Sequence, residues 1–137
     1  MNISFKSGFD QCGMPLVYTD DRRLCFLIDT GASHNVLLRD AYVRERDLFG
    51  KRGKSNYLIG MEGTPEDVFI VDGTIAIGGQ TLTTSFGVLD ASRAMETVRI
   101  ITGLTIDGAL GADFLRSNAL SVDFGSLSLH SGSDSRR

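Results

Sequence analysis

The sequence predicts a mostly β domain, and three observations support this. Apolar residues, many of them β-branched, occur in short segments along the whole chain. Glycine is plentiful, with 16 residues, whereas proline is rare, with 2. Turn signals such as Asp20-Asp21 and Gly78-Gly79 separate the apolar segments. Short strands divided by glycine-rich turns are typical of all-β and mostly β domains.

The length of 137 residues predicts one domain that is large enough to bury a core. We expect this domain to span residues 1–130 and a polar tail, residues 131–137, to be disordered. The net charge of −3 gives no reason to expect nucleic-acid binding. No apolar segment approaches the roughly 18–20 residues of a membrane span, so no membrane partner is expected.

The start of the chain has no charged segment followed by an apolar one, so no signal peptide is expected. Cys12 and Cys25 are the only cysteines. Two cysteines do not make a dense disulfide framework, and we expect two free thiols. These observations predict a cytoplasmic protein.

Short strands are expected in the first third of the chain. Alternating apolar and polar residues around Ile3 predict a first strand. A second strand is expected at residues 14–19 and a buried third strand at residues 23–28. The Asp20-Asp21 pair suits the hairpin turn between the last two. Residues 35–38 form a further short apolar segment, which predicts a strand.

The middle of the chain predicts a hairpin. Residues 39–49 mix apolar and charged side chains, as in a short surface helix or turn, and residues 50–54 are expected to form a loop. Residues 55–59 and 68–77 predict two strands. The segment between them, residues 60–67, is polar and bounded by glycines, which suits a projecting hairpin tip.

The last third predicts strands and a helix. Residues 91–96 suit one helical turn, whereas residues 98–101 are apolar and ambiguous between strand and loop. The other expected elements are strands at 80–89 and 106–110, a short helix at 112–118, and a final hairpin at 120–124 and 127–129.

The segment Asp29-Thr30-Gly31-Ala32 is the most informative part of the chain. It follows the apolar residues 24–28 and precedes the apolar residues 36–38. A carboxylate at the end of a hydrophobic strand is costly to desolvate unless it is paired or hydrogen-bonded. The hydroxyl, glycine and small alanine that follow suit a tight turn. The pattern therefore predicts an acid on a rigid loop, which suits acid–base chemistry.

Residues 26–33, Phe-Leu-Ile-Asp-Thr-Gly-Ala-Ser, resemble the catalytic signature of aspartic proteases. Residues 106–115 resemble a second feature of that family, in which two apolar residues and a glycine in a buried strand precede a short helix. Over roughly residues 14–129 the order of features is similar to that of the retropepsin-like, single-motif aspartyl protease domain of the retroviral type. The resemblance implies a closed β-barrel with a flap hairpin and one short C-terminal helix.

The chain has one Asp-Thr-Gly, because Asp72-Gly73-Thr74 and Asp107-Gly108-Ala109 lack the hydroxyl between Asp and Gly. The resemblance therefore implies a homodimer in which each subunit supplies one catalytic Asp29. Two carboxylates about 3 Å apart share one proton. The implied function is an aspartic endopeptidase that hydrolyses peptide or protein substrates with a water activated between the two Asp29 carboxylates, without a metal or other cofactor.

The resemblance also implies supporting roles around Asp29. Thr30 would join the two loops across the dimer, Gly31 would donate its N–H to the carboxylate, and Ala32 would line a subsite. The flap would cover the substrate with the tip residues Gly60, Met61, Glu62 and Gly63. Acidic side chains at Glu62, Glu66 and Asp67 depart from the usual apolar, glycine-rich flap tip and suggest basic residues in the substrate.

Two other interpretations stay open. The domain could be a non-catalytic retropepsin-like module for peptide binding or dimerisation. It could also be an unrelated small β-barrel that binds a small ligand, with Asp29 as a structural acid. His34 is expected to be a surface or packing residue, and Asp113 is expected to cap the helix that it begins.

Overall fold

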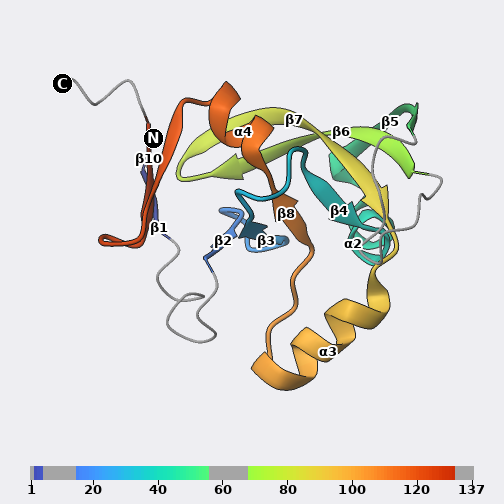
Figure 1. The fold of residues 1–137 in the computed structure, drawn as a ribbon. Helices are drawn as coiled ribbons and strands as arrows, with labels where there is room; N and C mark the ends of the chain where they lie inside the picture. The colour runs from blue at the N-terminus through green and yellow to red at the C-terminus, as the bar shows by residue number, and fades with distance from the viewer. Residues whose placement is uncertain (1, 5–14, 56–67, 132–137) are drawn as a thin grey trace.

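The structure is a computed structural model that describes residues 2–4, 15–55 and 68–131 (Figure 1). Most of the regular structure is β, arranged in two sheets. The larger sheet has seven strands in the order β2-β3-β8-β4-β7-β6-β5. These strands are β2 (Leu16–Tyr18), β3 (Cys25–Ile28), β4 (Val36–Leu38), β5 (Phe49–Ser55), β6 (Val68–Ile77), β7 (Gln80–Leu89) and β8 (Gly108–Leu110).

Strand β8 brings together two segments that are far apart in the sequence. It enters the sheet between β3, to which it is parallel, and β4, to which it is antiparallel. Leu110 at the end of β8 is the register partner of Ile28 at the end of β3. Because parallel strands end at the same edge of a sheet, the loop after Ile28 and the glycine after Leu110 are neighbours, although about 80 residues separate them in sequence.

The second sheet joins the two ends of the described chain. Its order is β1-β10-β9, and all of its pairs are antiparallel. The strands are β1 (Asn2–Ser4), β9 (Leu120–Asp123) and β10 (Ser128–Ser131). Ile3 is paired with Leu129, and both side chains are buried. The first and last of the described strands therefore pair with each other within one subunit.

Three α-helices and one 3₁₀ turn connect these strands in the described residues. They are α2 (Arg39–Arg44), η1 (Arg46–Leu48), α3 (Ser92–Thr102) and α4 (Ala112–Ser117). Figure 1 shows α3 standing away from the large sheet, between β7 and β8. In the described part of the chain, no helix is both long and apolar enough to span a bilayer.

Aromatic rings form the centre of the main core. The rings of Phe26 and Phe86 stack with centroids 5.5 Å apart, and the Phe49 ring meets Phe86 edge-on at 5.7 Å. Tyr42 from α2 joins this group against Phe69. The sheet curls around these rings as a half-barrel, so the alternating apolar residues of its strands cover one continuous core. The described residues show this half-barrel, and the closed barrel that the resemblance implies stays a prediction.

One of the elements expected in the middle of the chain was wrong. Residues 50–54 are not a loop but belong to β5, which pairs with β6 through a bulge between Lys51 and Gly53. The polar composition of these residues gave no strand signal. They form a strand because their backbone pairs with the long neighbouring strand β6. The short helix expected near the C-terminus is α4, and α2 lies within residues 39–49, where a short surface helix or turn was expected.

Residues 98–101, expected to form a strand or a loop, instead belong to helix α3, which extends well beyond the one helical turn expected at residues 91–96. Met95 and Val98 pack against the buried residues of two small apolar clusters beneath the helix, while Ile100 and Ile101 are exposed. Gly103 ends the helix in the left-handed conformation at φ 75°, as glycine commonly does. A stripe of only two packed residues is too weak a helical pattern for the full length of the helix to be predicted from the sequence.

Candidate active site

Asp29 lies in a tight turn immediately after β3. Its backbone N–H donates to the Leu110 carbonyl at 3.0 Å, so the turn continues the pairing between β3 and β8. Its own carbonyl accepts the Ala32 N–H at 3.1 Å, which closes the turn. Gly31 donates its N–H to the Asp29 carboxylate at 3.0 Å, the bond that the resemblance implied. The side chain of Asp29 is half-buried, so the loop holds an acid whose backbone is fixed and whose carboxylate meets solvent.

Two glycines allow β8 to pass close to the loops around Asp29. A Cβ on Gly108 would lie 2.1 Å from the carbonyl oxygen of Val36 in β4. A Cβ on Gly111 would lie 2.6 Å from the Ala32 oxygen and 2.7 Å from the His34 oxygen. All three contacts are with backbone, which cannot turn aside as a flexible side chain can. The glycines of residues 106–115 are therefore required by close packing against the Asp29 loop and β4.

Asn35 is a buried residue that braces the site. Its Oδ1 accepts the Gly111 N–H at 2.9 Å, and its Nδ2 donates to Thr84 Oγ1 at 3.0 Å and to the Ser85 carbonyl at 3.1 Å. One amide side chain thus joins the Asp29 loop, the end of β8 and β7. Sequence analysis did not single out this residue; a polar side chain at the start of an apolar strand was the available signal.

We expect Asn35→Ala to lower the free energy of unfolding by about 2–3 kcal/mol, because it leaves buried hydrogen-bonding groups without partners. Urea unfolding followed by circular dichroism measures this change. Asn118→Ala is the matched control, since among the described residues Asn118 makes one side-chain bond, to the Phe114 carbonyl in α4. An equal loss of stability in the two variants would contradict the bracing role of Asn35.

Helix α4 is fastened to the far side of the Asp29 loop. Ala112 and Asp113 donate their N–H groups to the carbonyls of Ala32 and Ser33, at 2.7 and 3.0 Å. The Asp113 carboxylate lies 2.7 Å from His34 Nδ1 and also pairs with Arg116. The expected capping role of Asp113 was wrong, because the N-cap is Gly111 and no side chain caps this helix. His34 is exposed, as expected for a surface residue.

The other expected site residues are placed as follows. Thr30 and Gly31 are exposed, and Ala32 is half-buried beside α4. The flap residues Gly60, Met61, Glu62 and Gly63 lie outside the described residues, as does Cys12. Within residues 2–4, 15–55 and 68–131, no group of three His, Cys, Asp or Glu side chains is placed to hold a metal ion.

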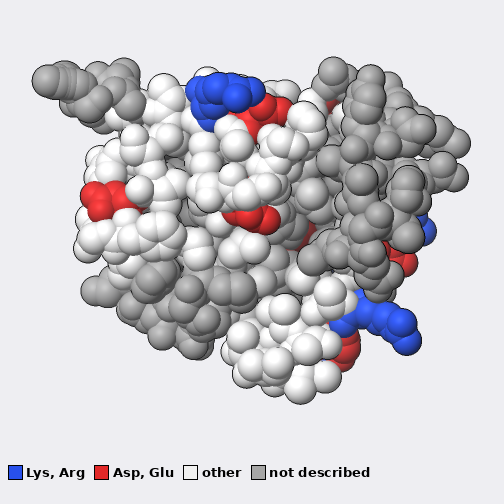
Figure 2. All heavy atoms as spheres, viewed as in Figure 1, with Lys and Arg blue, Asp and Glu red and all other residues white. Residues whose placement is uncertain are grey.

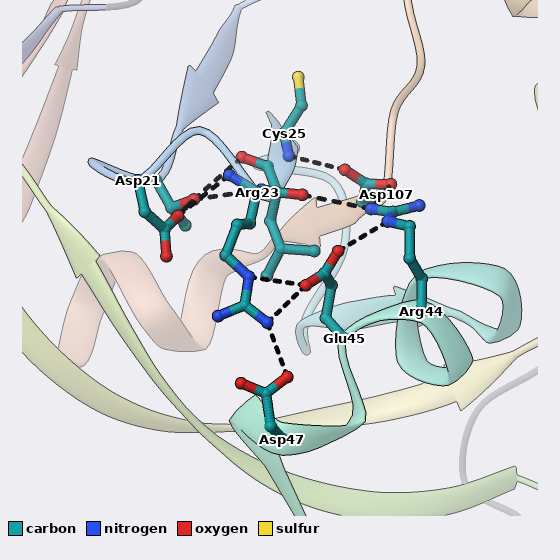
Figure 3. A network of polar contacts seen from close by, with 9 residues as sticks. Asp21, Arg23, Cys25, Arg44, Glu45, Asp47 and Asp107 are labelled. Atoms are coloured by element: carbon teal, nitrogen blue, oxygen red, sulfur yellow. Dashed lines mark hydrogen bonds and ion pairs between the residues drawn. The ribbon is translucent and has the colours of Figure 1, made fainter.

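Charged side chains are scattered over the face of the molecule in Figure 2, where a mixed acidic and basic group lies over α4. A different charged network lies at the other end of β3 and β8 (Figure 3). There Asp107 is buried, and its carboxylate accepts the Cys25 N–H at 2.9 Å and Arg44 Nη2 at 3.0 Å. Arg44 also donates to Glu45 at 2.8 Å. This network ties α2 to the start of both strands that carry the site.

Arg23 extends this network to the surface. It donates to Glu45 Oε1 at 2.7 Å and to Asp47 Oδ1 at 2.6 Å. Hydrogen bonds from Arg44 and Arg23 lower the pKa of Glu45, and the bond from Arg23 lowers the pKa of Asp47. Because the network joins residues far apart in sequence, no local motif pointed to it.

These lowered pKa values predict that the protein loses stability in acid. A carboxyl group whose pKa is lower in the folded state stabilises the fold above its unfolded pKa, and this contribution is lost as the pH falls through the folded pKa. We therefore expect the free energy of unfolding to fall below about pH 4. In Arg23→Gln the fall should be smaller, because Glu45 and Asp47 lose a cationic partner.

Urea unfolding at several pH values between neutral and acid tests this expectation. Arg93→Gln is the control, since Arg93 is exposed on α3 and outside the network. The Arg23 N–H that lowers the pKa of Asp21 is a backbone group and stays in place in Arg23→Gln. Parallel pH profiles for the wild type and Arg23→Gln would rule out the network as the source of the acid sensitivity.

No family model and no curated protein matches this chain. Among solved structures, it is similar to the crystal structure of the retroviral protease-like domain of Ddi1 from Leishmania major. The two chains are 12% identical with a TM-score of 0.52, and the match covers 90% of this chain and 96% of that one. At this identity the similarity concerns the fold, which is retropepsin-like. It does not support an unrelated β-barrel.

Proposed function

We propose that this protein is an aspartic endopeptidase that acts as a homodimer. The observation that carries the proposal is the Asp29 turn, in which a half-buried carboxylate accepts a backbone N–H at 3.0 Å. Asn35, Gly111 and α4 hold this turn in place through the bonds described above. A carboxylate on so strongly braced a loop suits a catalytic acid or base, which must keep its position during the reaction.

The need for a second subunit follows from the chemistry. Peptide hydrolysis by a water molecule requires a base for the water and an acid for the substrate. One carboxyl group cannot be ionised and protonated at the same time. Two copies of Asp29 related by a two-fold axis can share a single proton, because two close carboxylates do not both ionise. Thr30 is exposed beside Asp29 and is proposed to contact the partner's loop.

The proposed reaction then needs no covalent intermediate. The ionised Asp29 takes a proton from water as the water oxygen attacks the scissile carbonyl carbon. The protonated Asp29 donates its hydrogen to the carbonyl oxygen, which gives a tetrahedral diol. The newly protonated Asp29 gives its proton to the amide nitrogen while the ionised Asp29 takes one from a diol hydroxyl, so the C–N bond breaks and an amine and a carboxylic acid are released. The flap tip, Gly60 to Gly63, is proposed to cover the substrate and exclude water during these steps.

A non-catalytic module for peptide binding or dimerisation is the second candidate. The acidic residues Glu62, Glu66 and Asp67 favour it, because they depart from an apolar flap tip that would close over a substrate. Such a module would dimerise and bind peptides but would have no use for two facing carboxylates. Hydrolysis is therefore the property that separates the two candidates.

The test compares wild type with Asp29→Asn in two measurements. Cleavage of an unfolded protein substrate is followed by mass spectrometry, and the mass of the assembly is measured by analytical ultracentrifugation. The proposal expects a dimer in both proteins and cleavage only in the wild type. A wild-type dimer that does not cleave the substrate would support the non-catalytic module instead.

A further inference from the structure

A second feature of the molecule lies away from Asp29, at the start of β3 and β8. A cavity of about 380 Å³ opens there between the β2–β3 hairpin and the segment that leads from α3 to β8. This volume is within the range of small-molecule sites. The lining residues are Tyr18, Arg22, Arg23, Cys25, Arg44, Gly103, Leu104, Thr105 and Asp107.

Arg22 is the unusual residue of this cavity. Its guanidinium carbon lies 4.4 Å from the centroid of the Tyr18 ring, and its side chain forms no carboxylate pair with the described residues. Its backbone has φ 65°, a left-handed conformation that is uncommon for a residue other than glycine. The turn thus places an exposed guanidinium over an aromatic ring at the wall of a cavity.

The other two arginines of the wall are already neutralised. Arg23 pairs with Glu45 and Asp47, and Arg44 pairs with Glu45 and Asp107 (Figure 3). Asp107 has both carboxylate oxygens occupied, by Arg44 and by the Cys25 N–H. Arg22 is therefore the cation of this wall that has no anionic partner among the described residues. One such cation suits a ligand with a single negative charge.

The remainder of the wall is suited to an apolar body. Tyr18 and Leu104 are half-buried and pack against the apolar cluster of Leu16, Cys25 and Ile106. We propose that this cavity binds a small monocarboxylate, with its carboxylate on Arg22 and its apolar part against Tyr18 and Leu104. Two sources have this chemistry: a free apolar acid, and the C-terminal residue of a peptide with an apolar side chain.

Nuclear magnetic resonance titration of the whole ¹⁵N-labelled chain with hexanoate tests the proposal. We expect saturable shifts of the backbone amides of Gly103, Leu104 and Thr105 and of the Arg22 Nε signal. Hexan-1-ol and hexylammonium should not reproduce them, because neither has a carboxylate. Arg22→Gln should raise the dissociation constant about tenfold, since the charge-assisted bond is lost.

Arg46→Gln is the matched control. Arg46 also stacks on a tyrosine, with its guanidinium carbon 4.9 Å from the Tyr42 ring centroid, but it does not line this cavity. Its substitution should leave the dissociation constant of hexanoate unchanged. Thermal unfolding of each variant shows whether a change in binding reflects a change in fold.

An acetylated tripeptide that ends in leucine with a free carboxylate distinguishes the two sources. If it binds more tightly than hexanoate, a chain terminus is the preferred ligand; if hexanoate binds more tightly, a free acid is. Three results would overturn the proposal: no saturable shift at Gly103–Thr105, equal shifts with hexan-1-ol, or an unchanged dissociation constant in Arg22→Gln. None of these outcomes depends on whether Asp29 is catalytic.

Discussion

Asp29→Asn is expected to abolish peptide hydrolysis and to leave the fold and the assembly intact. Asparagine has almost the same shape as aspartate, and its side-chain oxygen can still accept the Gly31 N–H that binds Asp29 at 3.0 Å. It cannot take up or release the proton that the proposed reaction requires. We expect kcat/KM to fall by at least about 1,000-fold, as is typical when acid–base catalysis is removed. Cleavage assays with wild type and variant at equal concentration measure this change.

Asp123→Asn is the matched control for this prediction. The Asp123 carboxylate also accepts a backbone N–H two residues later, from Gly125 at 2.8 Å, but it lies at the end of β9 in the smaller sheet. Its substitution should leave hydrolysis unchanged. Undiminished cleavage by Asp29→Asn would disprove the proposed mechanism, whereas a loss of dimer in this variant would show that Asp29 acts in assembly.

Gly108→Ala is expected to lower the free energy of unfolding by at least about 3 kcal/mol, because it over-packs the centre of the sheet. The new Cβ would lie 2.1 Å from the Val36 carbonyl oxygen and 3.2 Å from the Leu37 Cα. Both are backbone atoms of β4, so the strands would have to separate where β8 supports the Asp29 turn. Urea unfolding gives the loss of stability, and a cleavage assay gives any loss of activity.

The control for this prediction is Gly50→Ala. Gly50 is also a strand residue, but no atom lies within 4 Å of the position of an added Cβ. We expect the stability of this variant to stay within about 0.5 kcal/mol of the wild type. If Gly108→Ala were as stable as Gly50→Ala, the close approach of β8 to β4 would not exist in the protein.

Most strands could be predicted from the sequence, because their apolar residues are contiguous or alternate. Residues 23–28 and 68–77 contain β3 and β6, and the helix expected at 112–118 is α4. Strand β5 could not be predicted, and only one turn of helix α3, within residues 91–96, was expected. The first is ordered by pairing with β6, and the second by packing of Met95 and Val98 on clusters formed by other segments.

The candidate site, too, could be predicted only in part from the sequence. Asp29 and Gly31 were expected from a local motif, because a tight turn after a strand is encoded by neighbouring residues. Asn35 was not expected, since its partners Gly111, Thr84 and Ser85 come from other parts of the chain. The network of Arg23, Arg44, Glu45 and Asp107 was missed for the same reason.

Local patterns in the sequence were therefore enough to predict the mostly β class and to locate the acid that we propose to be catalytic. The tertiary structure decided how that acid is held. Insertion of β8 between β3 and β4 brings Gly111 beside the Asp29 loop. Gly108 and Gly111 are necessary because they contact backbone atoms of segments that lie far away in the sequence. Short-range patterns encode turns and strands, whereas packing and buried polar partners depend on which strands become neighbours.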